Sequence, residues 1–247
     1  MTYNTPYRPE DLINLVDFPI HQNGPERDAL ISEVHAQLAA DGCAVLKRFL
    51  TERAITLLTE EADSVASCAH RSFNRTNPYV TVDDPLLDAA DPRRRFYDRS
   101  NALILADNFI PTGPLRVIQD FSAFDPFIQT CLQQKNFYRY ADPLADVIVN
   151  MAEEGEGFPW HFDTNNFTIT LAIQSAEEGG LFESAPNIRA EGASFPAVRA
   201  VLDGTSDLVC SLVLEPGDLQ MFKGRDSRHR VTAGRGATPR YVAIFSY

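Results

Sequence analysis

Residues 157–174 read GFPWHFDTNNFTITLAIQ, and a His-x-Asp pair, His161 and Asp163, stands before the strand-forming half of this stretch. Side chains two residues apart in a strand point to the same face, so we expect both groups on one face. His229 follows after four to five strand-like runs, and Arg240 comes eleven residues later, from 229 to 240. Two imidazoles and one carboxylate can hold one face of an octahedral Fe(II) ion and leave the opposite face open. The pattern therefore predicts a metal site formed by His161, Asp163 and His229.

Arg240 distinguishes this pattern from a chance grouping of polar residues. A lone His-x-Asp pair is weak evidence, because such residues also serve in turns and hydrogen bonds. A guanidinium is a planar donor fork that binds a carboxylate through two hydrogen bonds, so Arg240 could anchor the far end of a dicarboxylate that chelates the same metal. His21, His35 and His70 have no such context, and we interpret His35 as a surface or boundary residue of a helix.

Five stretches in the last third of the chain resemble the Fe(II)/2-oxoglutarate-dependent dioxygenase superfamily. They are GFPWHFDTNNFTITLAIQ (157–174), GGLFESAPNIR (179–189), EPGDLQMF (215–222), HRVTAG (229–234) and PRYVAIFSY (239–247). The chain is more closely similar to the subgroup that acts on free amino acids and includes radical halogenases of lysine-like substrates. That likeness rests on the WHF-x-TN-x-FT and APNIR strings and on RRFYDRSNALILADNF at 94–109.

The resemblance implies an enzyme that uses Fe(II), 2-oxoglutarate and O₂, with His161, Asp163 and His229 as metal ligands and Arg240 as the 2-oxoglutarate anchor. Oxidative decarboxylation to succinate and CO₂ then provides an oxidant for an unactivated C–H bond, while the protein supplies ligation, orientation and a dry pocket. In the halogenating members a Gly replaces the carboxylate ligand and leaves a site for chloride. Because Asp163 occupies this position, the resemblance points to oxygenation.

Candidate substrate residues are Arg99, Thr164 and Asn165. Arg99 resembles the arginine with which the amino-acid-modifying subgroup grips the substrate α-carboxylate; the alternative is a surface ion pair with Asp98 or a neighbouring Glu. Thr164 and Asn165 follow the third ligand directly, and they either border the pocket or simply turn the strand. Their neutrality disfavours a cationic substrate side chain, although an acid from elsewhere could supply the missing charge. We expect hydroxylation of a free amino acid or similar small carboxylate.

Alternating strands and turns predict a mainly β protein with flanking helices, forming a single domain over residues 1–247. Strands are expected at 43–50, 144–153, 167–174, 181–184, 208–214, 219–222, 228–232 and 240–247, with turns at 178–180 and 215–218. Many short strands at this spacing indicate a sandwich or barrel. The resemblance selects a double-stranded β-helix (jelly roll, cupin-like) with its core at 136–247.

The first half of the chain predicts helices that support the sheet. A helix is expected over 26–40, with Leu30, Ile31, Val34 and Leu38 on one face and Gly42 as its stop, and a second helix from the N-cap Thr51 to about Cys68, with Ile55, Leu58, Ala62 and Val65 inward. Pro114 and Pro126 each suit a first helical position, which predicts helices over 114–121 and 126–134. Residues 1–26 are expected to form an N-terminal arm over the surface, and 27–135 helical support with a substrate-pocket segment. The irregular stretch 70–107 is too long for a connector and is expected to form the pocket wall.

Length and charge indicate a compact enzyme with a small-molecule partner. The 247 residues carry 22 Lys and Arg against 34 Asp and Glu, a net charge of −12, which argues against nucleic acid or an anionic membrane as a partner. The four cysteines lack zinc-type spacing and are expected as free thiols. The N-terminus lacks the features of a signal peptide, and no window approaches the apolar length of a membrane span, so we expect a cytoplasmic protein. The sequence does not indicate an oligomeric state.

Two other functions remain open at this stage. The same iron centre could direct the substrate radical to desaturation, ring closure or C–C cleavage, because the ligands would be identical. A jelly-roll protein could also bind a divalent metal without catalysis, but a structural metal has no need of a dicarboxylate anchor such as Arg240. The sequence ends at Tyr247, without the C-terminal extension that can act as a lid in the halogenating relatives. We therefore expect the 70–107 segment, the arm or another subunit to close the site; alternatively, the pocket stays more open and accepts a larger substrate.

Overall fold

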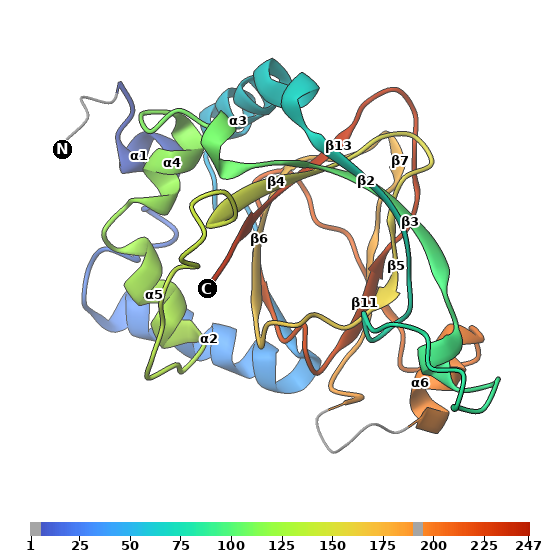
Figure 1. The fold of residues 1–247 in the computed structure, drawn as a ribbon. Coiled ribbons are helices and arrows are strands. Elements are labelled where there is room, and N and C mark those ends of the chain that lie inside the picture. Colours follow the sequence, from blue (N-terminus) through green and yellow to red (C-terminus); the bar gives the residue numbers. More distant parts are fainter. Residues whose placement is uncertain (1–5, 190–194) are drawn as a thin grey trace.

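The computed structural model describes residues 6–189 and 195–247, and two facing antiparallel sheets dominate it (Figure 1). The seven-stranded major sheet has the order β1-β10-β6-β13-β4-β3-β2, and the four-stranded minor sheet has the order β5-β11-β8-β9. The strands are β1 (Cys43–Leu46), β2 (His70–Thr76), β3 (Tyr97–Ile104), β4 (Val147–Ala152), β5 (Phe158–His161), β6 (Thr168–Gln174), β8 (Phe182–Ala185), β9 (Cys210–Leu212), β10 (Leu219–Phe222), β11 (Arg228–Val231) and β13 (Arg240–Phe245). A separate two-stranded ribbon pairs β7 (Glu178–Gly179) with β12 (Gly234–Arg235). The predicted mainly β jelly roll is confirmed.

The outer face of the major sheet packs against helices to form the main hydrophobic core. Figure 1 shows these helices together on one side of the sheet. They are α1 (Pro9–Leu12), α2 (Pro25–Asp41), α3 (Glu52–Val65), α4 (Pro114–Gln119) and α5 (Phe124–Cys131). Alternate residues of β13 face the helices: Tyr241, Ala243 and Phe245 are buried in this core. The intervening residues therefore point to the other face, toward the minor sheet.

The inner face of the major sheet is consequently free to line a cavity between the two sheets. Val242 and Ile244 of β13, Ile148 of β4 and Leu103 of β3 all point there. One seam between the sheets is joined by an isolated bridge between Ser100 and Gly157, which brings β3 against β5. The sandwich therefore places polar and apolar side chains from six or more strands around one enclosed space.

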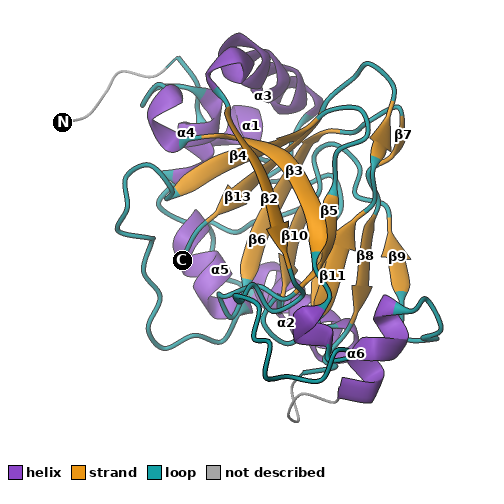
Figure 2. Ribbon diagram, turned by 45° about the vertical axis from the view of Figure 1, so that its right-hand side comes forward, coloured by secondary structure: helices purple, strands orange, loops and turns teal. Residues whose placement is uncertain are grey.

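The outer face of the minor sheet is covered by α6 (Phe195–Leu202), a helix that was not predicted. Val201 of α6 packs with Trp160 of β5 and Ala185 of β8 in a second, small hydrophobic cluster. Figure 2 shows α6 near the ends of β8, β9 and β11. The chain between β2 and β3 also reaches α6, because Arg199 donates a hydrogen bond to the carbonyl of Ala90.

Both long predicted helices are confirmed. In α2 the predicted residues Leu30, Ile31, Val34 and Leu38 are the buried ones, and Gly42 ends the helix in the left-handed conformation with φ 63°. In α3 the side chain of Thr51 accepts a hydrogen bond from the backbone N–H of Ala54, as expected of an N-cap. The predicted strands are all present, although half of them are two to four residues shorter than expected.

Three predictions about the first half of the chain are wrong in part. The stretch 70–107 is not irregular, because His70–Thr76 and Tyr97–Ile104 pair as a hairpin at the edge of the major sheet. The second short helix begins at Phe124 rather than at Pro126, so Pro126 lies in its first turn, where a missing N–H is still tolerated. The N-terminal arm is not simply a surface segment, because Leu12, Ile13 and Ile20 are buried in the main core; residues 1–5 lie outside the described part of the chain.

The remaining global predictions concern charge, thiols and membranes. The basic cluster at 93–95 is paired with acids: each of its three arginines, Arg93, Arg94 and Arg95, forms an ion pair with an aspartate. The cluster therefore does not offer an unpaired basic surface to a nucleic acid. The four cysteines are free thiols. None of the helices in the described ranges combines the length and the hydropathy needed to cross a bilayer.

Glu61 of α3 makes the stability of the helical layer depend on pH. Its carboxylate accepts a hydrogen bond from the backbone N–H of Leu115, and burial raises its pKa from 4.5 to about 7. A carboxyl group whose pKa is raised in the folded state contributes stability that is complete below the unfolded value and is lost as pH rises through the folded value. Glu61→Gln should therefore be more stable than the wild type above pH 7, by on the order of 1 to 2 kcal/mol, and show no such gain at pH 4.

Chemical denaturation at several pH values measures this difference. Glu60→Gln is a matched control, because Glu60 is the exposed neighbour on the same helix. Equal stability changes in the two variants across the pH range would show that Glu61 is not the group responsible.

Candidate active site

Three side chains meet at the inner face of the minor sheet. His161 ends β5, His229 lies opposite it on β11, and Asp163 follows two residues after His161. Oδ1 of Asp163 lies 3.5 Å from Nε2 of His161 and 3.4 Å from Nε2 of His229. This is the only group of three metal-ligating side chains found in the part of the chain that the structure describes. The distances leave room for one ion bound by two nitrogen atoms and one oxygen atom.

Backbone carbonyls fix the orientation of both imidazole rings. Nδ1 of His161 lies 2.8 Å from the carbonyl oxygen of Pro159, and Nδ1 of His229 lies 3.0 Å from that of Ser227. A carbonyl can only accept, so each Nδ1 carries the proton and each Nε2 keeps its lone pair for a metal. Phe182 and Phe222 pack against His229, with ring centroids 5.7 and 4.9 Å away. These contacts hold the two nitrogen ligands in place before any metal binds.

The carboxylate ligand is held as firmly as the histidines. Oδ2 of Asp163 accepts a hydrogen bond of 2.5 Å from the hydroxyl of Thr168, and its backbone N–H donates to the carbonyl of Gly224. A Cβ atom at Gly224 would lie 1.9 Å from Oδ2, so only glycine lets the carboxylate occupy this position. Thr168 thus binds one oxygen atom and leaves Oδ1 to face the histidines.

The electrostatics favour a neutral His161 and an ionised Asp163, the states that metal binding needs. Burial lowers the pKa of His161, and the neighbouring His229 lowers it further, which favours the neutral imidazole. Burial alone would raise the pKa of Asp163, but the two histidines hold it well below its usual range. Neutral imidazole and ionised carboxylate are the forms that coordinate a divalent cation.

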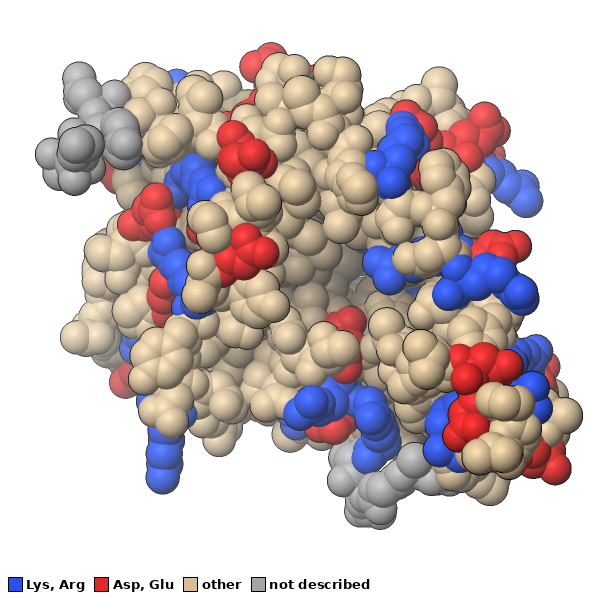
Figure 3. All heavy atoms as spheres, viewed as in Figure 1, with Lys and Arg blue, Asp and Glu red and all other residues tan. Residues whose placement is uncertain are grey.

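The three groups open into a cavity of about 210 Å³ between the sheets. Figure 3 shows this face of the molecule hollowed at its centre. The side chains of His161 and Asp163 retain 18% and 20% exposure, whereas His229 retains 5%, so solvent reaches the site mainly at His161 and Asp163. The other lining residues are Arg99, Leu103, Ile148, Asn150, Phe158, Thr168, Thr170, Phe182, Gln220, Phe222, Val231, Arg240, Val242 and Ile244. Such a donor set with an open side fits Fe(II).

Arg240 enters the same cavity from the first position of β13. It is buried, with 8% exposure, and it forms no ion pair with any carboxylate in the described ranges. Burial lowers its pKa to about 10, so the guanidinium remains charged at neutral pH. A buried cation without a counter-charge is costly unless an anion joins it. Arg240 is therefore suited to bind an anionic ligand in this cavity.

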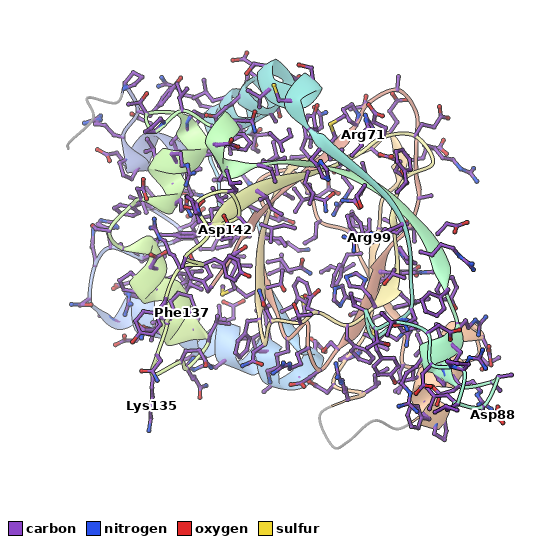
Figure 4. All side chains as sticks on the ribbon, viewed as in Figure 1. Arg71, Asp88, Arg99, Lys135, Phe137 and Asp142 are labelled. Atoms are coloured by element: carbon purple, nitrogen blue, oxygen red, sulfur yellow. The ribbon has the colours of Figure 1, made fainter. Side chains whose placement is uncertain are left out.

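Arg99 is the second arginine of the cavity. Figure 4 shows it on the inside of the sandwich, far from the labelled surface residues Asp88 and Lys135. Its guanidinium lies 5.0 Å from the ring centroid of Phe158, and Nε donates to Oδ1 of Asn101 at 3.2 Å. The surface ion pair considered from the sequence is not formed, because the Asp98 carboxylate pairs instead with Arg75. Arg99 forms no ion pair among the described residues, although Asp163 of the same cavity acts on it electrostatically.

Thr164 and Asn165 do not line the cavity. β5 ends at His161, so the chain leaves the sheet there and both side chains are exposed on the connection to β6. Their expected place at the pocket border is corrected to this exposed loop. Thr168, four residues beyond Thr164, faces the cavity in their place.

Sequence reasoning also missed Asn150. It stands in β4 with 7% exposure, and its Oδ1 atom is buried without a hydrogen-bond partner. An asparagine in the otherwise apolar run VIVNMA is a signal that could have found it, because a polar residue in a buried strand needs a partner.

The chain was compared with protein families, curated protein sequences and solved structures. A family model described as Halogenase D matches residues 26–247. No curated protein sequence matches the chain.

Solved structures share the fold at low sequence identity. A 2OG-Fe(II) oxygenase family oxidoreductase from Burkholderia pseudomallei is 12% identical, covers 91% of each chain and has a TM-score of 0.54. A prolyl hydroxylase from Trichoplax adhaerens, solved with a hypoxia inducible factor peptide fragment, is 15% identical over 90% of each chain, with a TM-score of 0.56. The epimerase SnoN from nogalamycin biosynthesis, solved with Fe3+, alpha ketoglutarate and nogalamycin RO, is 13% identical over 88% of this chain and 82% of its own, with a TM-score of 0.56.

Proposed function

The chain belongs to the Halogenase D family, and we propose that it is an Fe(II)- and 2-oxoglutarate-dependent oxygenase that hydroxylates an sp3 C–H bond of a free amino acid or similar small carboxylate. In this proposal His161, Asp163 and His229 bind Fe(II), and Arg240 binds the distal carboxylate of 2-oxoglutarate. The iron centre with 2-oxoglutarate and O₂ supplies the oxidant for the C–H bond.

One observation supports the proposal most directly. Arg99 and Arg240, neither of which forms an ion pair in the described ranges, face the cavity that contains the three metal-ligating side chains. Each guanidinium binds a carboxylate well in a buried site, and a single 2-oxoglutarate leaves one carboxylate for Arg240 after it chelates the metal. Arg99 is then available for a second carboxylate, which is the substrate's. The cavity volume of about 210 Å³ favours a small molecule over a folded partner at this depth.

The rest of the cavity wall suggests what the substrate carries besides a carboxylate. Asn150 offers a buried oxygen atom without a donor, which suits the ammonium group of an amino acid. Apart from Asp163, the residues that line the cavity include neither Asp nor Glu, so a cationic side chain would have no counter-charge. Leu103, Ile148 and Ile244 instead favour an uncharged, largely apolar side chain.

Asp163 separates the proposed reaction from halogenation, despite the name of the family. Its carboxylate occupies the third protein position, and Thr168 and Gly224 hold it there. A halide at that position would have to displace an ionised, hydrogen-bonded group. We therefore propose oxygen transfer as the outcome.

A product screen tests this proposal. The full chain is incubated with Fe(II), ascorbate, 2-oxoglutarate and mixed amino acids under air in high chloride, and the products are identified by mass. We expect a product with one added oxygen atom. A product that has lost two hydrogen atoms, or a ring-closed or cleaved product, would assign the same centre to another oxidation, and a chlorinated product would contradict the role given to Asp163.

Arg99→Ala should weaken the primary substrate and spare 2-oxoglutarate. Losing a charge-assisted fork should cost about 2 to 5 kcal/mol, which corresponds to an increase of tens of times or more in the substrate's Kd. Arg75→Ala is the matched control, because Arg75 lies on the neighbouring strand and is largely exposed. Anaerobic titration of each ligand into the Fe(II)-loaded protein separates the two affinities. An unchanged substrate affinity would assign Arg99 a structural role.

A further inference from the structure

A second group of polar side chains lies on the opposite face of β11 from the metal site. Arg228 precedes His229 in this strand, and neighbouring strand residues point to opposite faces. Arg228 is completely buried, yet Nε and Nη1 have no hydrogen-bond partner. Only Nη2 has one, a long contact of 3.4 Å to the carbonyl of Trp160.

Two tyrosine hydroxyl groups share this situation. The hydroxyls of Tyr79 and Tyr97 are buried and also lack a partner, so four of the seven such atoms in the described ranges belong to Arg228 and these two residues. Phe162 is the common neighbour: its ring centroid lies 5.6 Å from the Arg228 guanidinium and 5.4 Å from the ring of Tyr79. The two hydroxyls lie close enough to the Arg228 guanidinium to interact with it electrostatically, but the three groups form no hydrogen bond with one another.

Within residues 6–189 and 195–247, Arg228 forms no ion pair with an acidic side chain. Of the acids nearby, Asp91 is paired with Arg93, and Asp203 is paired with Arg95. Arg189 adds a further cation 5.0 Å from the ring of Phe162. A buried guanidinium without a counter-charge destabilises the fold, because it has lost its hydration.

We propose that Arg228, Tyr79 and Tyr97 bind a small inorganic anion of the size of chloride. A halide ion can accept the four missing hydrogen bonds and also neutralises the guanidinium, whereas a single water molecule accepts fewer hydrogen bonds and carries no charge. The atoms are closed to solvent, which excludes a large organic anion. The site is separate from the metal ligands, because the strand β11 stands between them.

This anion would support the metal site indirectly. Arg228 precedes His229, and the backbone N–H of Phe162 donates to the carbonyl of Pro78, the neighbour of Tyr79, so the residues that bind the anion adjoin both segments that provide the ligands. An anion that binds only the folded state stabilises it in proportion to the logarithm of its concentration above Kd.

Two measurements on the full chain test the site. Crystals grown in sodium bromide should show an anomalous peak between Arg228 Nε and Nη1 and the two tyrosine hydroxyls. The melting temperature should also rise saturably with sodium chloride, relative to sodium gluconate at equal ionic strength. The rise should persist in His161→Ala, in which the metal site is broken, and should be lost in Arg228→Gln.

Tyr97→Phe keeps the proposal testable if Arg228→Gln does not fold. It removes one hydroxyl group and should weaken the apparent chloride affinity by about 3- to 10-fold. Arg71→Ala is the control for general salt effects, since Arg71 is 39% exposed and paired with Glu153. An ordered water in place of the bromide peak would overturn the proposal, as would a chloride effect that is the same in wild type, Tyr97→Phe and Arg228→Gln.

Discussion

His161→Ala is expected to lose both stoichiometric metal and turnover. The substitution removes one of three protein ligands, and the remaining pair of groups, Asp163 and His229, no longer defines one face of the ion. Removal of a partner that merely orients a ligand typically costs 10- to 100-fold in metal affinity, so the loss of a ligand itself should exceed about 100-fold. Metal content after dialysis and succinate formation from 2-oxoglutarate measure the two effects.

His70→Ala is the matched control for this change. His70 is exposed at the start of β2 and lies outside the cavity, so its removal should leave both quantities at wild-type values. Full metal content and full turnover in His161→Ala would show that the triad is not the metal site.

Arg240→Ala should raise the 2-oxoglutarate requirement by tens of times or more. The arginine is buried and lacks an acidic partner among the described residues, so the distal carboxylate would lose a charge-assisted fork worth about 2 to 5 kcal/mol. Metal content should not change, because Arg240 is not a ligand. Anaerobic titration of 2-oxoglutarate into the Fe(II)-loaded variant measures the change directly.

The control is Arg235→Ala on the neighbouring β12, where the side chain is exposed. Comparison with Arg99→Ala separates the two anchors. If Arg99→Ala weakened 2-oxoglutarate as much as Arg240→Ala, the assignment of one arginine to each carboxylate would be wrong.

The grouping of His161, Asp163 and His229 was predictable because the His-x-Asp pair is local and the three residue types together are chemically specific. His161 and Asp163 are two residues apart, and His229 stands in a strand that β-sheet pairing could bring opposite. The outer parts of the site were less accessible to sequence reasoning. Where β5 ends decides whether Thr164 and Asn165 face the cavity, and strand ends depend on tertiary pairing rather than on local preference.

The fold shows the same division between strong and weak local signals. The strand β10 has the predicted bounds, because an apolar run follows a clear Pro-Gly turn. The hairpin of β2 and β3 was missed, because His70–Thr76 is mostly exposed and shows no alternation of apolar residues. The buried Leu12 and Ile13 lie in the short apolar-rich stretch LINLVDFPI (12–20), and its burial depends on tertiary packing that sequence reasoning did not anticipate.

Conversion of 2-oxoglutarate to succinate under air, with Fe(II) and ascorbate, tests the central claim most directly. Wild-type protein is compared with His161→Ala and with an anaerobic sample, in the presence of mixed amino acids. The account predicts oxygen-dependent succinate formation by the wild type alone, increased by the amino acid that also gains an oxygen atom. A wild-type protein that binds Fe(II) at the triad but forms no succinate with any substrate would contradict it.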